Sequence, residues 1–151
     1  MRLVLKYWLP VLLWMIFIFV GSTDLMSAEH TSRFLVPFLR WLAPDISDAA
    51  VATIQLFIRK CAHLAEYAIL AAFLLRALRK SQERLARAAA SAFILAAIYA
   101  AFDEFHQSSV PSRTASPYDV AIDTAGALAG LAIYWRTMCQ ASTRNPKSNL
   151  S

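Results

Sequence analysis

Five side chains that can ionise or form strong hydrogen bonds lie within one short stretch, RKCAHLAEY. They are Arg59, Lys60, His63, Glu66 and Tyr67, and the apolar run AILAAFLLRAL follows them directly. Ionisable groups are costly in lipid, so in an apolar segment they usually face a protein interior or a water-filled cavity and mark a functional site. His63 and Glu66 are one helical turn apart, which suits either acid–base chemistry or a buried pair whose members only neutralise each other.

Two later apolar runs carry similar polar groups at one end, with a loop between them. The first run ends in DEFHQ, the loop SSVPSRTASP follows, and the second run begins with YDVAID. These segments add seven candidate ligand-binding residues to the five above: Asp103, Glu104, His106, Gln107, Arg113, Asp119 and Asp123. Adjacent helical residues point about 100° apart, so we expect only one of Asp103 and Glu104 to face inward. Arg113 is suited either to clamping the carboxylates or to binding an anionic ligand.

The composition points to a membrane protein. The chain has 151 residues, of which 58% are hydrophobic, above the ~45–50% that is usual in soluble domains. The formal net charge is +5, but the basic residues cluster at the ends of apolar runs. That distribution is typical of topology signals and not of a nucleic-acid surface. Cys61 and Cys139 lie near opposite ends of two different runs, so we expect neither a disulfide nor a cysteine-based metal site.

The apolar runs predict an all-α membrane protein with four transmembrane helices. We place the spans at about 4–22, 55–78, 87–106 and 119–137. Lysine and arginine favour the cytoplasmic side, and their distribution predicts that both termini are cytoplasmic. The first run has a basic start and also resembles a signal peptide, but the tryptophans along it favour a retained helix.

Two further segments complete the predicted architecture. Residues 31–42 place Phe34, Phe38 and Trp41 on one helical face, which predicts a short helix lying in the membrane interface. We therefore expect one transmembrane domain over 1–138 and a disordered cytoplasmic tail over 139–151.

Helix geometry brings the polar residues of three spans to one side of the membrane. Counted from the basic inner ends at ~1.5 Å per residue, Glu66, Asp103 and Asp123 lie roughly 15–24 Å up, in the middle and outer parts of a ~30 Å core. Gly126 and Gly130 form a GxxxG pattern on the helical face of Asp123, and this pattern permits close approach of another helix. We therefore expect the three spans to converge on one polar site.

Together these motifs resemble the VanZ-like family of small bacterial multi-pass membrane proteins. The resemblance covers about residues 8–135 and is carried by four segments: Lys60 with HLAEY at 63–67, DEFHQ at 103–107, PSR at 111–113, and DVAIDTAG at 119–126. The family loop usually reads PGR, so Ser112 stands in place of the glycine. The resemblance implies a cell-envelope protein of the bacterial cytoplasmic membrane. It also implies a link to glycopeptide resistance for some members, because the founding member is linked to low-level teicoplanin resistance.

Two classes of function remain open. The first is a binding or envelope-modulating protein whose outward-facing polar pocket holds a lipid headgroup or cell-wall precursor through Arg59, Lys60 and Arg113. The second is an intramembrane enzyme on a lipid-linked substrate, with His63 as acid and Glu66 or Asp103 as base. A metal variant of this enzyme would use His63, Glu66, His106 and Asp103, but these lack HxH or HExxH spacing, so we assign no metal and no cofactor. The expected partners are the bilayer and such a ligand, and not nucleic acid.

Overall fold

A computed structural model describes residues 2–23, 28–82, 84–110 and 116–144, and all the regular structure in these ranges is α-helical. The helices are α1 (Arg2–Gly21), α2 (Ala28–Leu42), α3 (Asp48–Leu78), α4 (Leu85–Gln107) and α5 (Pro117–Arg144). The expectation of an all-α fold is confirmed for this part of the chain.

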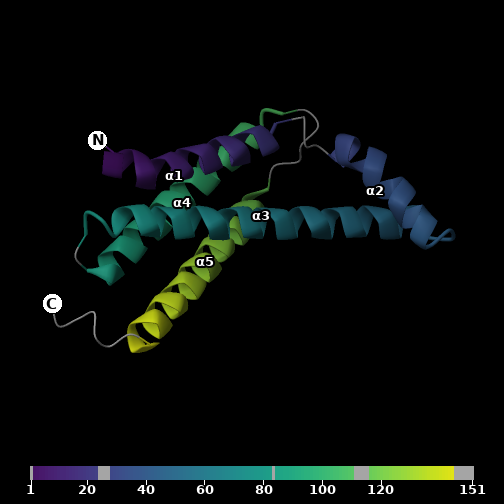
Figure 1. Ribbon diagram of the computed structural model, residues 1–151. Helices are drawn as coiled ribbons and strands as arrows, with labels where there is room; N and C mark the ends of the chain where they lie inside the picture. The colour runs from purple at the N-terminus through teal and green to yellow at the C-terminus, as the bar shows by residue number, and fades with distance from the viewer. Residues whose placement is uncertain (1, 24–27, 83, 111–115, 145–151) are drawn as a thin grey trace.

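Helix α3 is the central element, and each of the other four helices packs against it (Figure 1). It is an unbroken helix of 31 residues, so it is about 46 Å long at 1.5 Å per residue. The side chain of Ser47 caps its start by accepting a hydrogen bond from the Ala50 backbone N–H at 3.2 Å. At this end only α2 lies alongside, held by an Arg40–Asp48 ion pair of 2.8 Å and by Gln55, which donates to Ser32 at 2.8 Å.

Small residues allow α3, α4 and α5 to pack closely. Helix α4 buries Ala88, Ala92, Ala96 and Ala100, which recur every fourth residue and so form one stripe along it. On α5, a Cβ atom built on Gly126 would overlap the Leu64 carbonyl oxygen of α3, and one on Gly130 would overlap the Ala68 carbonyl oxygen. The GxxxG pattern therefore acts as expected, because only residues without a side chain allow these two backbones to come so near.

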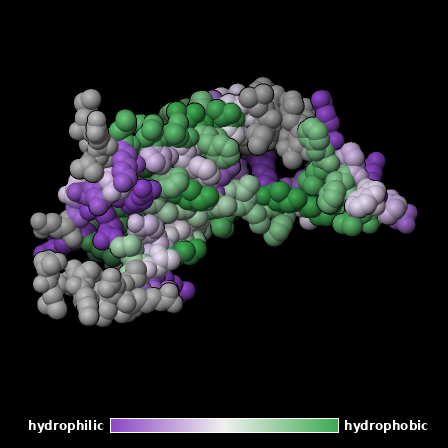
Figure 2. All heavy atoms as spheres, viewed as in Figure 1, coloured by the Kyte–Doolittle hydropathy of each residue, from purple (hydrophilic) through white to green (hydrophobic). Residues whose placement is uncertain are grey.

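Hydropathy is consistent with the expected membrane protein. Among the described residues, Asp48–Leu78 and Leu85–Gln107 are long and apolar enough to cross a membrane, and Leu5–Gly21 is a shorter apolar helical segment. Large apolar side chains are exposed along all of them, and Figure 2 shows them spread over the face formed by α1 and α3. In water such a surface would be an aggregation liability, whereas in lipid it is the expected exterior.

Helix α1 is an integral part of the bundle. The Trp14 indole N–H donates to the Glu66 carbonyl oxygen of α3 at 2.9 Å, and the Tyr99 hydroxyl of α4 donates to the Met15 carbonyl oxygen at 2.7 Å. Val11 and Ile18 are buried in the same core as α3 and α4. In the described chain α1 therefore shares one core with α3 and α4.

The two ends of the bundle differ in charge. Helix α1 begins and α5 ends at the same end of the bundle (Figure 1). At that end Lys6, Arg76 and Lys80 surround the ring of Tyr7, at 5.1 to 6.0 Å from its centroid. The buried acidic residues lie at the other end, so the described chain has a basic end and an acidic end.

The last helix extends further than expected. Helix α5 continues to Arg144, whereas we expected a disordered tail from residue 139. Residues 145–151 lie outside the described part of the chain.

Candidate functional site

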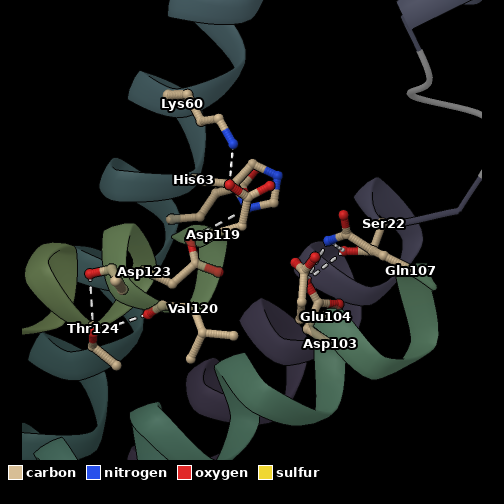
Figure 3. A network of polar contacts seen from close by, with 12 residues as sticks. Ser22, Lys60, His63, Asp103, Glu104, Gln107, Asp119, Val120, Asp123 and Thr124 are labelled. Atoms are coloured by element: carbon tan, nitrogen blue, oxygen red, sulfur yellow. Dashed lines mark hydrogen bonds and ion pairs between the residues drawn. The ribbon is translucent and has the colours of Figure 1, made fainter. Parts of the chain in front are cut away.

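The polar residues predicted from three spans do meet at one end of the bundle, where α1 contributes a fourth helix. The buried ones are Ser22, His63, Asp103, Glu104, Gln107, Asp119 and Asp123. Figure 3 shows them as two groups, one between α3 and α5 and one between α1 and α4. We call the two groups together the polar cluster.

The group between α3 and α5 consists of two side-chain pairs. Lys60 forms an ion pair with Asp119, one of the first residues of α5. One turn further in, His63 Nδ1 lies 3.3 Å from Asp123 Oδ1, which is ion-pair distance, although the two atoms do not meet hydrogen-bond geometry. Asp123 is only 1% exposed, because Gly126 draws this part of α5 against α3. The spacing on α3 suggested a pair of His63 with Glu66; the structure also brings Asp123 of α5 to ion-pair distance of His63.

The group between α1 and α4 is organised around Asp103. Its Oδ2 accepts hydrogen bonds from the Ser22 hydroxyl at 2.7 Å and from the Gln107 amide at 2.9 Å, and that amide also lies 3.2 Å from the Ser22 oxygen. Ser22 directly follows the last residue of α1 and is 2% exposed. The three side chains therefore close the outer end of the α1–α4 contact with a shared hydrogen-bond network.

The expectation that only one of Asp103 and Glu104 faces inward is wrong, because both are buried. Their side chains point in different directions, and each side chain meets a neighbouring segment of the chain. Asp103 faces the end of α1, and the Glu104 carboxylate accepts a hydrogen bond from the backbone N–H of Ser116, just before α5. The end of α4 is covered on both sides, so an angle of about 100° between the two side chains exposes neither.

Tyr67 lies between the two groups. Its side chain is fully buried, and it is within electrostatic range of Asp103, Asp123 and Glu66. Its ring packs against that of Tyr99, with centroids 6.3 Å apart. Tyr67 therefore lies near carboxylates of both α4 and α5, without a hydrogen bond from its hydroxyl to either among the described residues.

The remaining candidates fall at the edge of this arrangement or outside it. Arg59 and Glu66 are half-buried on α3 and act electrostatically on His63. His106 stacks on Phe19 of α1, with ring centroids 4.5 Å apart, so it belongs to the α1–α4 side and does not face His63. Arg113 lies outside the described residues.

Many buried polar atoms in the polar cluster and directly around it have no hydrogen-bond partner among the described residues. They are Arg59 Nε and Nη2, His63 Nδ1, Tyr67 Oη, Asp103 Oδ1, Glu104 Oε2, His106 Nε2, Gln107 Oε1, and both carboxylate oxygens of Asp123. Native proteins satisfy nearly all such atoms, because a buried unpaired group costs roughly 1–3 kcal/mol. A concentration of so many unpartnered polar atoms in one place is expected of a site that completes its hydrogen bonds with a ligand or with water.

The structure gives no support to a metal centre in this region. No group of three or more His, Cys, Asp or Glu side chains within residues 2–23, 28–82, 84–110 and 116–144 is arranged to hold a metal ion. His63 and His106, which the metal variant combined, belong to different groups of the polar cluster.

Sequence reasoning missed Ser22. The motifs did not single it out, although its hydroxyl is a buried donor to Asp103. The sequence feature that could have identified Ser22 is its place at the end of the first apolar run. Polar residues at the corresponding ends of neighbouring apolar helices are expected at a similar depth.

Comparison with known proteins yields one match. A family model described as VanZ/LLP1 matches residues 7–139, nearly the same region as the resemblance drawn from the motifs. No curated protein and no solved structure matches the chain.

Proposed function

Because the chain belongs to the VanZ/LLP1 family, we propose that it is a multi-pass protein of the bacterial cytoplasmic membrane that holds a lipid or cell-wall-linked ligand in the polar cluster. The observation that carries this proposal is the set of unpartnered buried polar atoms shared by α3, α4 and α5. Groups that serve only to stabilise a bundle would be expected to satisfy one another.

The proposed topology has four spans, formed by α1, α3, α4 and α5, with both termini in the cytoplasm. Lys6, Arg76 and Lys80 gather at the end where α1 begins, and an excess of basic residues is typical of the cytoplasmic side. The polar cluster then opens toward the outer leaflet. Helix α2 lies in the outer interface, because it exposes Phe34, Phe38 and Trp41 to the surroundings.

The low dielectric of the bilayer makes the polar cluster suitable for binding. Electrostatic interactions there are several times stronger than in water, so a few well-placed groups provide both affinity and specificity. A ligand from the outer leaflet reaches this depth without crossing the membrane. A lipid-linked cell-wall precursor fits this description, and its capture would connect the protein with the glycopeptide resistance known for the founding member of the family.

Lipid analysis of the purified protein tests this proposal. The protein is extracted together with its surrounding membrane in polymer-bounded discs, and lipids enriched over bulk membrane are identified by mass spectrometry. We expect a lipid enriched with the wild type to be lost in His63→Ala and Asp123→Asn. Ser108→Ala is the matched control, because the Ser108 hydroxyl is exposed and bonds only to the Phe105 carbonyl oxygen of its own helix. Equal lipid profiles for all four proteins would contradict the proposal.

An intramembrane enzyme is the second candidate, and the 3.3 Å approach of His63 to Asp123 favours it. A carboxylate beside a histidine orients the imidazole and stabilises its charged form, the arrangement used for general acid–base catalysis. In this version Asp123 takes the orienting role, and Glu66 or Asp103 supplies a second carboxylate.

Turnover distinguishes the two candidates. An enzyme reconstituted with lipid extract consumes one lipid species over time, and Asp123→Asn slows the loss while the lipid still binds. A binding protein leaves every lipid species unchanged over the same period. Empty vesicles made from the same extract provide the baseline.

A further inference from the structure

A second feature of the structure lies beside the polar cluster, on the side toward the basic end of the bundle. It is an apolar groove of about 370 Å³ between α1, α3 and α4. Its walls come from three helices: Trp8, Val11, Leu12 and Met15 of α1, Leu70 and Leu74 of α3, and Leu95, Ile98, Tyr99 and Phe102 of α4. Its volume lies within the roughly 300–1,000 Å³ typical of small-ligand sites.

Each of the three helices places the groove and the polar cluster on one continuous face. On α3, one helical face carries Leu74 and Leu70 and, nearer the start of the helix, Tyr67 and His63. On α4, Tyr99 is followed in the same way by Asp103 and Gln107.

On α1, Met15 and Ile18 lead in the same direction to Ser22. The groove and the polar cluster therefore lie on the same faces of the three helices.

The groove also opens on the lipid-facing surface. Its rim residues Leu12, Leu95, Ile98 and Phe102 are all substantially exposed. Tyr99 joins the two regions, since it lines the groove and packs against the ring of Tyr67. A molecule already dissolved in the bilayer can therefore enter the groove sideways, next to the polar cluster.

Within the described ranges, five of the ten unpartnered atoms in and around the polar cluster are pure acceptors. Asp103 Oδ1, Gln107 Oε1, Glu104 Oε2 and the two Asp123 oxygens all lack a donor among the described residues. A head group that satisfies them must donate hydrogen bonds, as ammonium N–H and hydroxyl O–H groups do. Of the cations expected to bind an anionic ligand, Lys60 is already paired with Asp119, whereas Arg59 Nε and Nη2 have no hydrogen-bond partner among the described residues.

We propose that the ligand is a membrane amphiphile whose hydrocarbon chain occupies the groove and whose hydrogen-bond-donating head group occupies the polar cluster. This inference rests on the proposed binding function and narrows it to one class of lipid. The apolar groove recognises the chain without regard to its detailed structure, so the head group supplies the specificity. A bound lipid is then held across α1, α3 and α4, which are otherwise joined on this side only by side-chain contacts.

Filling the groove tests the position of the chain. Leu95→Trp places a large ring in the groove, whereas Ile94→Trp adds the same ring to the next residue of α4, which is exposed but does not line the groove. Loss of contact with about two methylene groups corresponds to roughly a tenfold loss of affinity, so we expect a reduction of about that size for Leu95→Trp only. Leu12→Trp with Leu13→Trp as its control repeats the comparison on α1, should the α4 variant not fold.

Lipid titrations followed by native mass spectrometry supply the affinities and also test the head group. The detergent-solubilised wild type is titrated with phosphatidylethanolamine, phosphatidylglycerol and phosphatidylcholine carrying identical acyl chains. The first two head groups have N–H or O–H donors, and the trimethylated choline has none. We expect at least one donor-bearing lipid to bind more tightly than phosphatidylcholine, and Asp123→Asn to reduce this preference.

The outcomes separate this inference from the proposed function. Lipid binding that is lost in Asp123→Asn but unchanged in Leu95→Trp and Leu12→Trp would overturn the groove as the chain site and leave the binding function standing. Equal binding of all three head groups would overturn the donor requirement. Binding unaffected by any of these variants would overturn both the inference and the proposed function.

Discussion

At the scale of single residues, the polar cluster depends on donors that meet buried carboxylates. Asp103 is 1% exposed and receives hydrogen bonds from Ser22 and Gln107. Asp119 is paired with Lys60, and Glu104 receives the Ser116 backbone N–H. Asp123 has only the nearby His63, and neither of its oxygens has a hydrogen-bond partner among the described residues. The carboxylates thus range from well satisfied to open, and the open ones are the natural contacts for a ligand.

Ser22→Ala tests the network around Asp103. Removal of the hydroxyl leaves the carboxylate with one donor fewer in a buried site, so we expect the free energy of unfolding to fall by about 1–3 kcal/mol. Unfolding titrations in mixed micelles, followed by helical circular dichroism, measure the change. The exposed Ser108→Ala serves as control and should change stability by less than about 0.5 kcal/mol. A loss no larger than that of the control would mean that Ser22 contributes nothing to the network.

At the scale of the helices, the position of α5 on α3 sets the geometry of half the polar cluster. Gly126 and Gly130 let α5 contact the α3 backbone at Leu64 and Ala68. Asp123 lies about one turn before Gly126 on the same face, so the close contact brings its carboxylate to His63. The helix contact and the polar pair are therefore two consequences of one stretch of sequence.

Alanine substitution of the glycines tests this contact. A methyl group at Gly126 or Gly130 meets a carbonyl oxygen of a helix backbone, which cannot turn aside as a side chain can, so the helices must separate. We expect each substitution to destabilise the protein by about 1–3 kcal/mol or more. Gly21→Ala is the matched control, because a Cβ atom there meets nothing within 4 Å. Equal stability of all three variants in the same unfolding titration would contradict the close packing.

At the scale of the whole molecule, charge is divided between the two ends of the bundle. Lys6, Arg76 and Lys80 gather at one end, and the buried carboxylates lie at the other. Large apolar side chains cover the surface between them, and the apolar groove opens on this surface. An orientation with the basic end in the cytoplasm places the polar cluster where outer-leaflet lipids can reach it.

Reporter fusions test this orientation. A green fluorescent protein fused after Asn145 should fluoresce, and alkaline phosphatase fused after Val110 should be active, because the first folds in the cytoplasm and the second only outside it. A phosphatase fusion after Arg84 is the internal control and should be inactive. Active phosphatase after Asn145 would contradict the four-span arrangement with both termini cytoplasmic.

The sequence by itself determined the local properties of the chain. The two helices long and apolar enough to cross a membrane, the spacing of His63 and Tyr67 on one helical face, and the Gly126–Gly130 pattern follow from the sequence, and the structure agrees with each of them. The motifs also sufficed to indicate the family. These features depend on residues within one helix, where the distance between side chains follows directly from their separation in sequence.

Only the tertiary structure decided which side chains meet. It paired His63 with Asp123, buried Asp103 and Glu104 together, and turned His106 toward Phe19. It also brought Ser22 to Asp103, 81 positions away in the sequence. Such contacts depend on how whole helices are rotated and pressed against each other, and that is set by the small residues along α4 and α5 and by the packing of every side chain between the helices.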